Sequence, residues 1–343
     1  MVQPANSWRR LSTAFPNYGI VDAAAGVLGG YLVVAGGRLD PTNIDTAVGT
    51  VRYLAQPSPT LLSPTWATSP NGLHTPRSAS AYAVANGRLY VIGGIANGDC
   101  LSTSEYATSA TGAWDYTTTP KLPDADADLH PDTLCQGTAV AIGTKIYVTG
   151  GLALHYLNAG SPGPVGNLSG APVTYVLDTV SNTWTYDVAN VDPSVERFST
   201  AGASDGSTAV VVGGIETYGA MELAPPTASV VTLTVGPSFA SVGSLPVAVG
   251  RGAAAYVSGS FYHYGGSSVT PNDSDSSGVD ALYKAAVSSP GAWSVVTPSG
   301  TAPAARSGHV FCRFTWTDGS EHLYAVGGQS GGLRTSAVDE FTP

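Results

Sequence analysis

The stretch LYVIGG (Leu89–Gly94) decides the fold, because an apolar strand that ends in two glycines recurs along the whole chain. The other copies are LVVAGG (Leu32–Gly37), IYVTGG (Ile146–Gly151), AVVVGG (Ala209–Gly214), FYHYGG (Phe261–Gly266) and LYAVGG (Leu323–Gly328). Successive diglycines are 52 to 63 residues apart. A repeat of this length predicts a fold built from similar units that pack against one another.

Each unit is predicted to be a four-stranded antiparallel meander. A strand precedes each diglycine strand and is joined to it by a short turn rich in Gly, Asn and Ser, as in a β-hairpin. A variable loop and a third strand follow the diglycine, and a fourth strand carries an aromatic residue. These aromatic residues are Trp66, Trp114, Trp184, Phe239 and Trp293. One such sheet cannot bury both of its faces, whereas six sheets packed radially can.

The two ends of the chain are predicted to complete one unit together. The sixth unit has three strands up to Pro343, and Trp8–Leu11 supplies an aromatic strand. We expect Trp8–Leu11 to pair with Ser336–Phe341, which closes the ring and removes its open edges. The predicted fold is an all-β, six-bladed β-propeller in one domain, 1–343. The expected blades are 17–69, 74–119, 133–188, 195–242, 249–297 and 304–343 plus 5–12.

The repeat resembles the Kelch repeat, in which a diglycine follows an inner strand and an aromatic residue marks an outer strand. The best matches are Pro76-Arg77-Ser78 with Gly87–Gly94, and Ala305–His309, which is similar to the Arg-x-Gly-His start of the family. The resemblance covers the whole chain and implies a Kelch-type propeller. It implies no single function, since such propellers include adaptors, copper-radical oxidases, mutarotases, iron-dependent specifier proteins and cyclisation enzymes.

Composition excludes two classes of partner. The chain has a net charge of −10 and only 14 basic residues among 343, with no cluster that would bind nucleic acid or an anionic membrane. No apolar run approaches the ~20 residues of a membrane-spanning helix, and residues 1–16 show no signal peptide. We expect a monomer whose partner is a small organic molecule or a saccharide.

Arginines are predicted to surround the central mouth of the propeller. Counting back from the diglycines places Arg77 and Arg197 16 residues before the first glycine, Arg251 14 residues before and Arg306 21 residues before. Arg38 directly follows the first diglycine. The planar guanidinium group suits carboxylate or enolate oxygens, so we expect these arginines to bind a ligand. The alternative is that each one ties blades together through backbone carbonyls.

Other side chains are expected near the same mouth. The further candidates for ligand binding are Tyr18, Gln136, Tyr156 and Tyr218. His74 and His130 lie in loops that lead to the mouth and are the candidates for a general base. His309 belongs to the Kelch-like motif and is interpreted as a core residue with satisfied hydrogen bonds.

No cofactor is predicted. The six histidines show no metal-ligand spacing, and no nucleotide-binding motif occurs in a suitable context. The acidic loops Asp124–Asp128 and Asp273–Gly278 resemble part of a calcium loop but lack the closing Glu. Calcium binding is therefore left open rather than predicted.

The cysteines bear on the compartment. Cys100 and Cys135 lie in segments that a propeller places on one face of adjacent blades, so we expect a disulfide between them. Cys312 lies within a strand and is expected to be a buried thiol. The disulfide and the sequons at Asn167 and Asn272 favour a secreted glycoprotein. The alternative is a cytoplasmic protein with three free thiols.

Two functions remain open at this point. The first is a metal-free, nucleotide-free enzyme of biosynthesis that catalyses cyclisation, isomerisation or cycloaddition of an oxygenated small molecule at the mouth. The second is a secreted lectin or peptide-binding module without turnover. An enclosed pocket with a perturbed acid or base favours the enzyme, and an open polar ring favours the binding module.

Overall fold

The computed structural model describes residues 3–58, 64–125, 131–155, 167–170, 173–189, 197–218, 222–269 and 278–343. Apart from the short 3-10 helix η1 (Ile44–Thr46), the regular elements of these residues are strands. No described helix is long and apolar enough to cross a membrane.

Six antiparallel sheets follow one another along the described chain. The first contains β2 (Ala24–Leu28), β3 (Tyr31–Ala35), β4 (Val51–Ala55) and β5 (Trp66–Thr68), and the second contains β6 (Ala81–Ala85), β7 (Arg88–Ile92) and β10 (Ser104–Ala107). The third contains β11 (Thr138–Ile142), β12 (Lys145–Thr149), β15 (Thr174–Asp178) and β16 (Thr183–Asp187).

The remaining sheets keep the same order of strands. The fourth contains β18 (Ala201–Ser204), β19 (Thr208–Val212), β22 (Ser229–Thr234) and β23 (Ser238–Ser244), and the fifth contains β24 (Ala253–Val257), β25 (Ser260–Tyr264), β26 (Leu282–Ala286) and β27 (Ser294–Val296). The sixth contains β29 (Val310–Thr315), β30 (Glu321–Val326), β33 (Val338–Thr342) and β1 (Ser7–Arg10), and β28 (Ser299–Gly300) pairs with β1 in parallel.

Short ribbons extend several sheets beyond the diglycines. They are β8 (Ile95–Ala96) with β9 (Asp99–Cys100), β13 (Leu152–His155) with β14 (Asn167–Gly170), β17 (Arg197–Phe198) with β20 (Ile215–Tyr218) and β21 (Glu222–Pro226), and β31 (Gln329–Ser330) with β32 (Leu333–Arg334).

The second sheet differs from the predicted four strands. Its expected outer segment, around Trp114, makes only a single bridge between Tyr106 and Asp115. The Asp115 carboxylate then accepts hydrogen bonds from the backbone N–H groups of Thr117 and Thr118, at 2.9 and 3.0 Å. This local turn draws the chain away from the sheet after one bridge.

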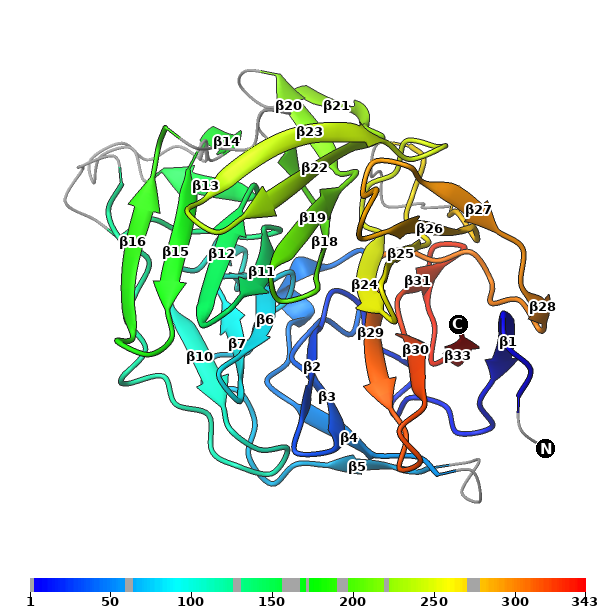
Figure 1. The fold of residues 1–343 in the computed structure, drawn as a ribbon. Coiled ribbons are helices and arrows are strands. Elements are labelled where there is room, and N and C mark those ends of the chain that lie inside the picture. Colours follow the sequence, from blue (N-terminus) through cyan, green and yellow to red (C-terminus); the bar gives the residue numbers. More distant parts are fainter. Residues whose placement is uncertain are drawn as a thin grey trace.

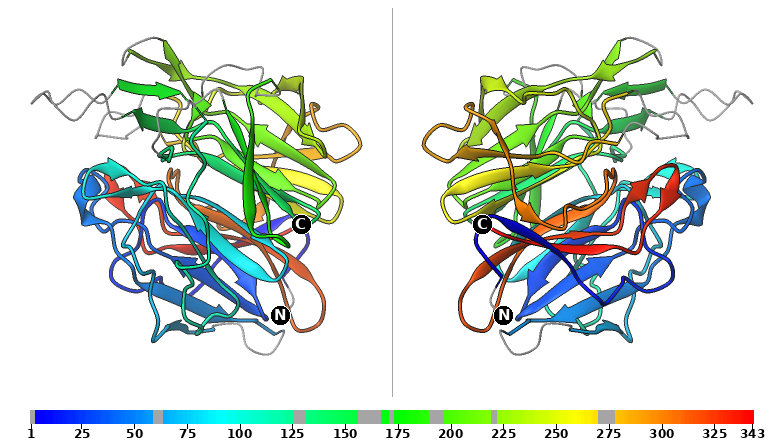
Figure 2. Two further views of the ribbon diagram at one scale, coloured as in Figure 1. Left: turned by 90° about the vertical axis from the view of Figure 1, so that its left-hand side faces the viewer. Right: turned by 90° about the vertical axis from the view of Figure 1, so that its right-hand side faces the viewer.

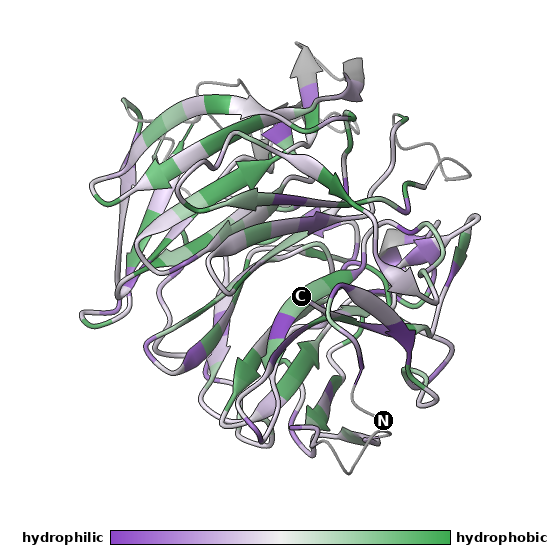
Figure 3. Cartoon of the chain, turned by 45° about the vertical axis from the view of Figure 1, so that its right-hand side comes forward, coloured by the Kyte–Doolittle hydropathy of each residue, from purple (hydrophilic) through white to green (hydrophobic). Residues whose placement is uncertain are grey.

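The sheets stand around a common centre (Figure 1). Their first strands contact one another in the order β2, β6, β11, β18, β24 and β29, and β29 contacts β2 again. The last strands, such as β5, β16 and β23, lie at the periphery. Hydrophobic residues follow the strands, where they pack between neighbouring sheets (Figure 3). The arrangement is compatible with a β-propeller.

The first strand pairs with the last, as predicted. β1 lies antiparallel to β33, with Trp8 opposite Phe341 and Arg9 opposite Glu340, and the two strands run side by side in Figure 2. Arg9 pairs with buried Glu340 at 2.6 Å, and Arg10 pairs with Asp339. The Trp8 ring packs on Phe341, with centroids 5.2 Å apart. Strand pairing, ion pairs and aromatic packing therefore join the ends of the described chain.

The diglycines form the contact between neighbouring sheets. The first glycine of each pair has φ between 60° and 69° and the second between 91° and 106°. A Cβ on the first glycine would lie only 2.2–2.6 Å from a carbonyl oxygen of the next sheet, and the second glycine donates its N–H to that oxygen at 2.7–2.9 Å. The accepting residues are Ile20, Arg77, Leu134, Arg197, Val249 and Arg306. Both conformation and contact therefore require glycine.

A second set of backbone contacts runs around the centre, two residues further along each sheet. We call these six residues the axial ring, and they are Asp22, Ala79, Gln136, Ser199, Arg251 and Gly308. Each has φ between 52° and 59°, and each donates its N–H to the carbonyl of the ring residue in the preceding sheet at 2.7–2.9 Å. The six hydrogen bonds form a closed circuit, which offsets the strain of the left-handed conformation in the non-glycine residues.

Candidate functional site

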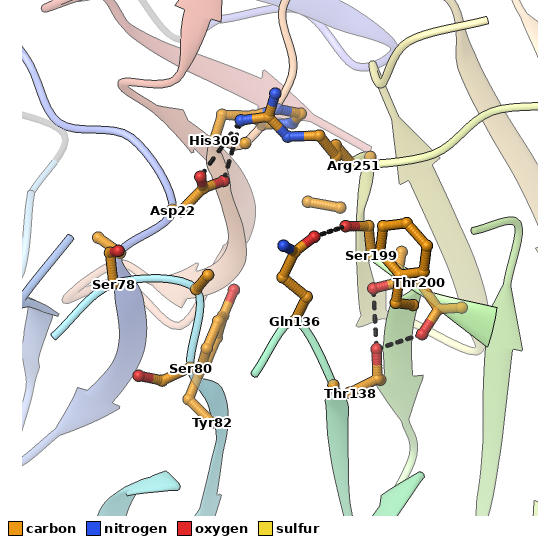
Figure 4. A pocket seen from close by; sticks show the side chains of 18 of the residues that line it. Asp22, Ser78, Ser80, Tyr82, Gln136, Thr138, Ser199, Thr200, Arg251 and His309 are labelled. Carbon is orange, nitrogen blue, oxygen red and sulfur yellow. Dashed lines mark hydrogen bonds and ion pairs between the residues drawn. The ribbon is translucent and has the colours of Figure 1, made fainter. Parts of the chain in front are cut away.

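A cavity of about 410 Å³ lies at the centre of the molecule, and residues of all six sheets line it (Figure 4). All six residues of the axial ring belong to its lining. The volume is within the range of pockets that bind small organic molecules. The backbone circuit therefore fixes six positions from which side chains can define the chemistry of one pocket.

One side of the pocket is charged. Asp22 accepts from Arg38 at 2.9 Å and from Arg251 at 3.2 Å, and Figure 4 shows the Asp22–Arg251 pair at the edge of the cavity. Burial raises the pKa of Asp22, but Arg251 and Arg38 together lower it by more, so it lies below the ordinary value of 3.8. The carboxylate is ionised and faces two guanidinium groups, and the lining contains no other charged side chain. The described lining thus carries one net positive charge.

Gly308 allows the Arg251–Asp22 pair to form. Arg251 belongs to the fifth sheet and Asp22 to the first, so the pair spans the sixth sheet at Gly308. A Cβ on Gly308 would lie 2.4 Å from an Asp22 carboxylate oxygen and 2.9 Å from Arg251 Nη2. Glycine at this axial position therefore leaves room for an ion pair across the pocket wall.

Neutral polar groups continue around the axial ring. Ser199 donates its hydroxyl to Gln136 Oε1 at 2.6 Å, and this contact leaves the Gln136 amide nitrogen directed toward the cavity (Figure 4). Thr138 donates its hydroxyl to the Thr200 carbonyl at 2.8 Å. Gln136 is thus held in place as a hydrogen-bond donor toward a bound molecule.

The opposite side is apolar. Ile95, Leu152 and Phe198 line the pocket and belong to one buried cluster with the disulfide between Cys100 and Cys135. The disulfide was predicted, and its Cα atoms are 5.3 Å apart. It joins the β8–β9 ribbon to the residue before Gln136. The bond therefore lies directly behind the apolar wall of the pocket.

His309 also lines the pocket, which differs from its interpretation as a satisfied core residue. Only 6% of the residue is exposed, and neither ring nitrogen has a hydrogen-bond partner. Burial, and to a smaller extent the charges of Arg306 and His263, hold the pKa of His309 well below 6.5. The ring is therefore neutral.

Three predicted ligand residues have a place inside their own sheets. Arg77, Arg197 and Arg306 are each 1% exposed and are not among the pocket residues. Each donates from Nη1 to the first carbonyl of its diglycine, at 2.9, 2.7 and 3.3 Å respectively. Arg77 also pairs with Glu105 at 2.7 Å, and Arg306 with Asp339. This geometry matches the alternative interpretation, in which the arginines hold strands together through carbonyls.

The other predicted residues divide between the pocket and the surface. Arg38, Arg251 and Gln136 line the pocket. Tyr18 is 83% exposed and lies outside the lining. The His74 ring stacks on Tyr116, with centroids 3.5 Å apart, also away from the pocket.

Several candidates fall outside what the structure describes. His130, Tyr156, most of the acidic loop Asp124–Asp128 and Asp273–Ser277 lie outside the described residues, and Tyr218 is described only as the end of strand β20. Within the described residues, no group of three or more His, Cys, Asp or Glu side chains could hold a metal ion.

Sequence reasoning missed part of the lining. Ser199, Tyr82 and His309 line the pocket but were not selected as ligand residues, and Asp22 was not recognised as the partner of two arginines. The available signal was the position two residues after the segment that meets each diglycine. Comparison with known proteins adds no name, because no family model matches this chain and no curated protein is significantly similar to it.

Proposed function

We propose that the chain is a six-bladed β-propeller of the Kelch type. Six diglycines at regular spacing, a closed circuit of first-strand contacts and the closed hydrogen bonds of the axial ring support this architecture. The pairing of β1 with β33 supplies the last blade with its outer strand, as ring closure requires.

We further propose that the central pocket belongs to a small-molecule enzyme that acts on an organic anion with an apolar body. One observation carries this proposal: the lining has a net positive charge on one side and an apolar wall on the other. The chain as a whole is strongly acidic, at −10, so a positive pocket is a local feature. A guanidinium pair suits a carboxylate or an enolate.

The proposed chemistry uses the groups of the pocket and requires neither a metal nor a nucleotide. Arg38 and Arg251 stabilise negative charge that develops on a substrate oxygen, and Gln136 donates a further hydrogen bond. The apolar wall around Phe198 holds the body of the substrate in one orientation. Cyclisation, isomerisation and cycloaddition of an oxygenated substrate all gain from this combination.

Phenylpyruvate is a suitable test molecule, because it combines a carboxylate, an enolisable ketone and an aromatic ring. Its binding is measured by calorimetry, and its keto–enol conversion is followed by ultraviolet absorbance. We expect the protein to bind it and to accelerate the conversion over buffer. Arg251→Lys, which keeps the charge but loses the planar fork, should weaken both effects without a change in thermal midpoint. The control Arg313→Lys alters a largely exposed arginine and should match the parent.

The outcomes separate the two functions. Binding without acceleration would replace the enzyme by the binding module without turnover. Absence of binding, or full activity in Arg251→Lys, would refute the anion pocket. The Cys100–Cys135 disulfide supports folding in an oxidising compartment, which is our proposal for localisation.

A further inference from the structure

His309 is a pocket residue whose hydrogen-bonding capacity is unused. Both ring nitrogens are buried and have no partner. Its aromatic neighbours are Tyr264 and Phe311, with ring centroids 5.1 and 6.4 Å away. A neutral imidazole has one donor and one acceptor nitrogen, and buried groups of this kind ordinarily have partners. The pocket is the side on which such a partner can be supplied.

The position of His309 places it beside the charged side of the pocket. It directly follows Gly308, whose backbone lies against both Asp22 and Arg251, and Figure 4 shows His309 close to the Asp22–Arg251 pair. Because the imidazole is neutral, it contributes hydrogen bonds rather than charge at this place. A molecule whose anionic group meets Arg38 and Arg251 therefore brings its adjoining atoms toward His309.

His263 shows that burial alone does not produce this arrangement. It is also a buried histidine, 1% exposed, with Nδ1 unpartnered. It is not among the pocket residues, because Gly252, which does line the pocket, lies against it: a Cβ on Gly252 would be 2.4 Å from His263 Nε2. Two buried histidines thus differ in whether a ligand can reach them.

We propose that His309 binds a neutral hydroxyl or carbonyl group of the ligand. The ligand class is then an organic acid that carries a hydroxyl or keto group in addition to its anionic group. This inference rests on the proposed function, since it places the anionic group of the same molecule at Arg38 and Arg251.

Benzoate and the three monohydroxybenzoates are the probes, and calorimetric titration gives their dissociation constants. We expect the best hydroxybenzoate to bind about tenfold more tightly than benzoate, as for one well-formed hydrogen bond in a buried site. His309→Phe keeps an aromatic ring against Tyr264 and should remove this preference while benzoate binding stays unchanged. The matched control His263→Phe should keep the preference.

Each result decides the matter. Equal binding of benzoate and all hydroxybenzoates, or a preference that persists in His309→Phe, would overturn the role of His309 while leaving the anion pocket intact. If none of the probes binds, the anion pocket fails and this inference fails with it. A measurement on the unaltered protein covers misfolding of the variant: hydroxybenzoate, but not benzoate, should shift the ring ¹⁵N signals of His309. Unchanged signals would also overturn the proposal.

Discussion

Replacing Gly93 by Ala should destabilise the protein far more than replacing Gly87, although both glycines belong to the second sheet. Their φ values are similar, at 60° for Gly93 and 70° for Gly87, so both alanines incur about 1–2 kcal/mol of left-handed strain. A Cβ on Gly87 meets no atom within 4 Å, whereas a Cβ on Gly93 lies 2.2 Å from the Leu134 carbonyl oxygen. The pair therefore isolates the contact between the second and third sheets.

The extra cost at Gly93 has two parts. The Leu134 carbonyl must move by about 1 Å, which costs roughly 1–3 kcal/mol as overpacking. This movement also breaks the hydrogen bond from Gly94 N–H, at 2.8 Å, and leaves buried groups unpaired at roughly 1–3 kcal/mol. The difference between the variants is then about 3–4 kcal/mol.

Differential scanning calorimetry measures this difference directly. For 343 residues, an unfolding entropy of about 2.1 cal/mol/K per residue corresponds to roughly 1.4 °C per kcal/mol. We expect the Gly87→Ala midpoint to fall by about 2 °C and the Gly93→Ala midpoint by about 7 °C. Midpoints within one degree of each other would refute the role assigned to the diglycine.

The other predictions concern closure, thiols and pH. A chain without residues 1–12 should lose its cooperative thermal transition, because β33 loses its neighbour; a midpoint within a degree or two of the parent would contradict this. The denatured, unreduced protein should titrate one thiol, that of Cys312, and three thiols would exclude the disulfide. Burial lowers the pKa of His263 to about 3, so below pH 6.5 the unfolded chain binds a proton that the folded protein does not. Its contribution to stability should fall by about 1.4 kcal/mol per pH unit between pH 6 and pH 4; urea unfolding of His263→Phe should show a shallower pH dependence, and an equal slope would refute the assignment.

The strands and the diglycines could be predicted from the sequence because their causes are local. A left-handed backbone next to a carbonyl of another sheet admits only glycine, so the contact leaves a visible mark at each of the six positions. The pairing of Cys100 with Cys135 followed from the placement of two segments on one face of neighbouring units. The fourth strand of the second sheet could not be predicted in the same way, since the Asp115 turn competes with strand pairing through its own hydrogen bonds.

The pocket residues could be predicted only in part, because an offset of two residues changes the role of a side chain. Arg77 belongs to the segment that meets a diglycine, whereas Arg251 belongs to the axial ring. Counting back from the diglycines placed both in one group, since the intervening hairpins differ in length. The role of His309 depends on the absence of a partner, which no sequence pattern records.

The axial ring separates the scaffold from the chemistry that it presents. Its hydrogen bonds join main-chain atoms only, so the circuit is indifferent to most of the side chains that it carries. Substitutions at Ala79 or Ser199 can alter what the pocket recognises without removing any bond of the circuit, whereas Gly308 is constrained by the ion pair beside it. A fold of this kind can acquire new selectivity one position at a time, in natural divergence and in protein engineering alike.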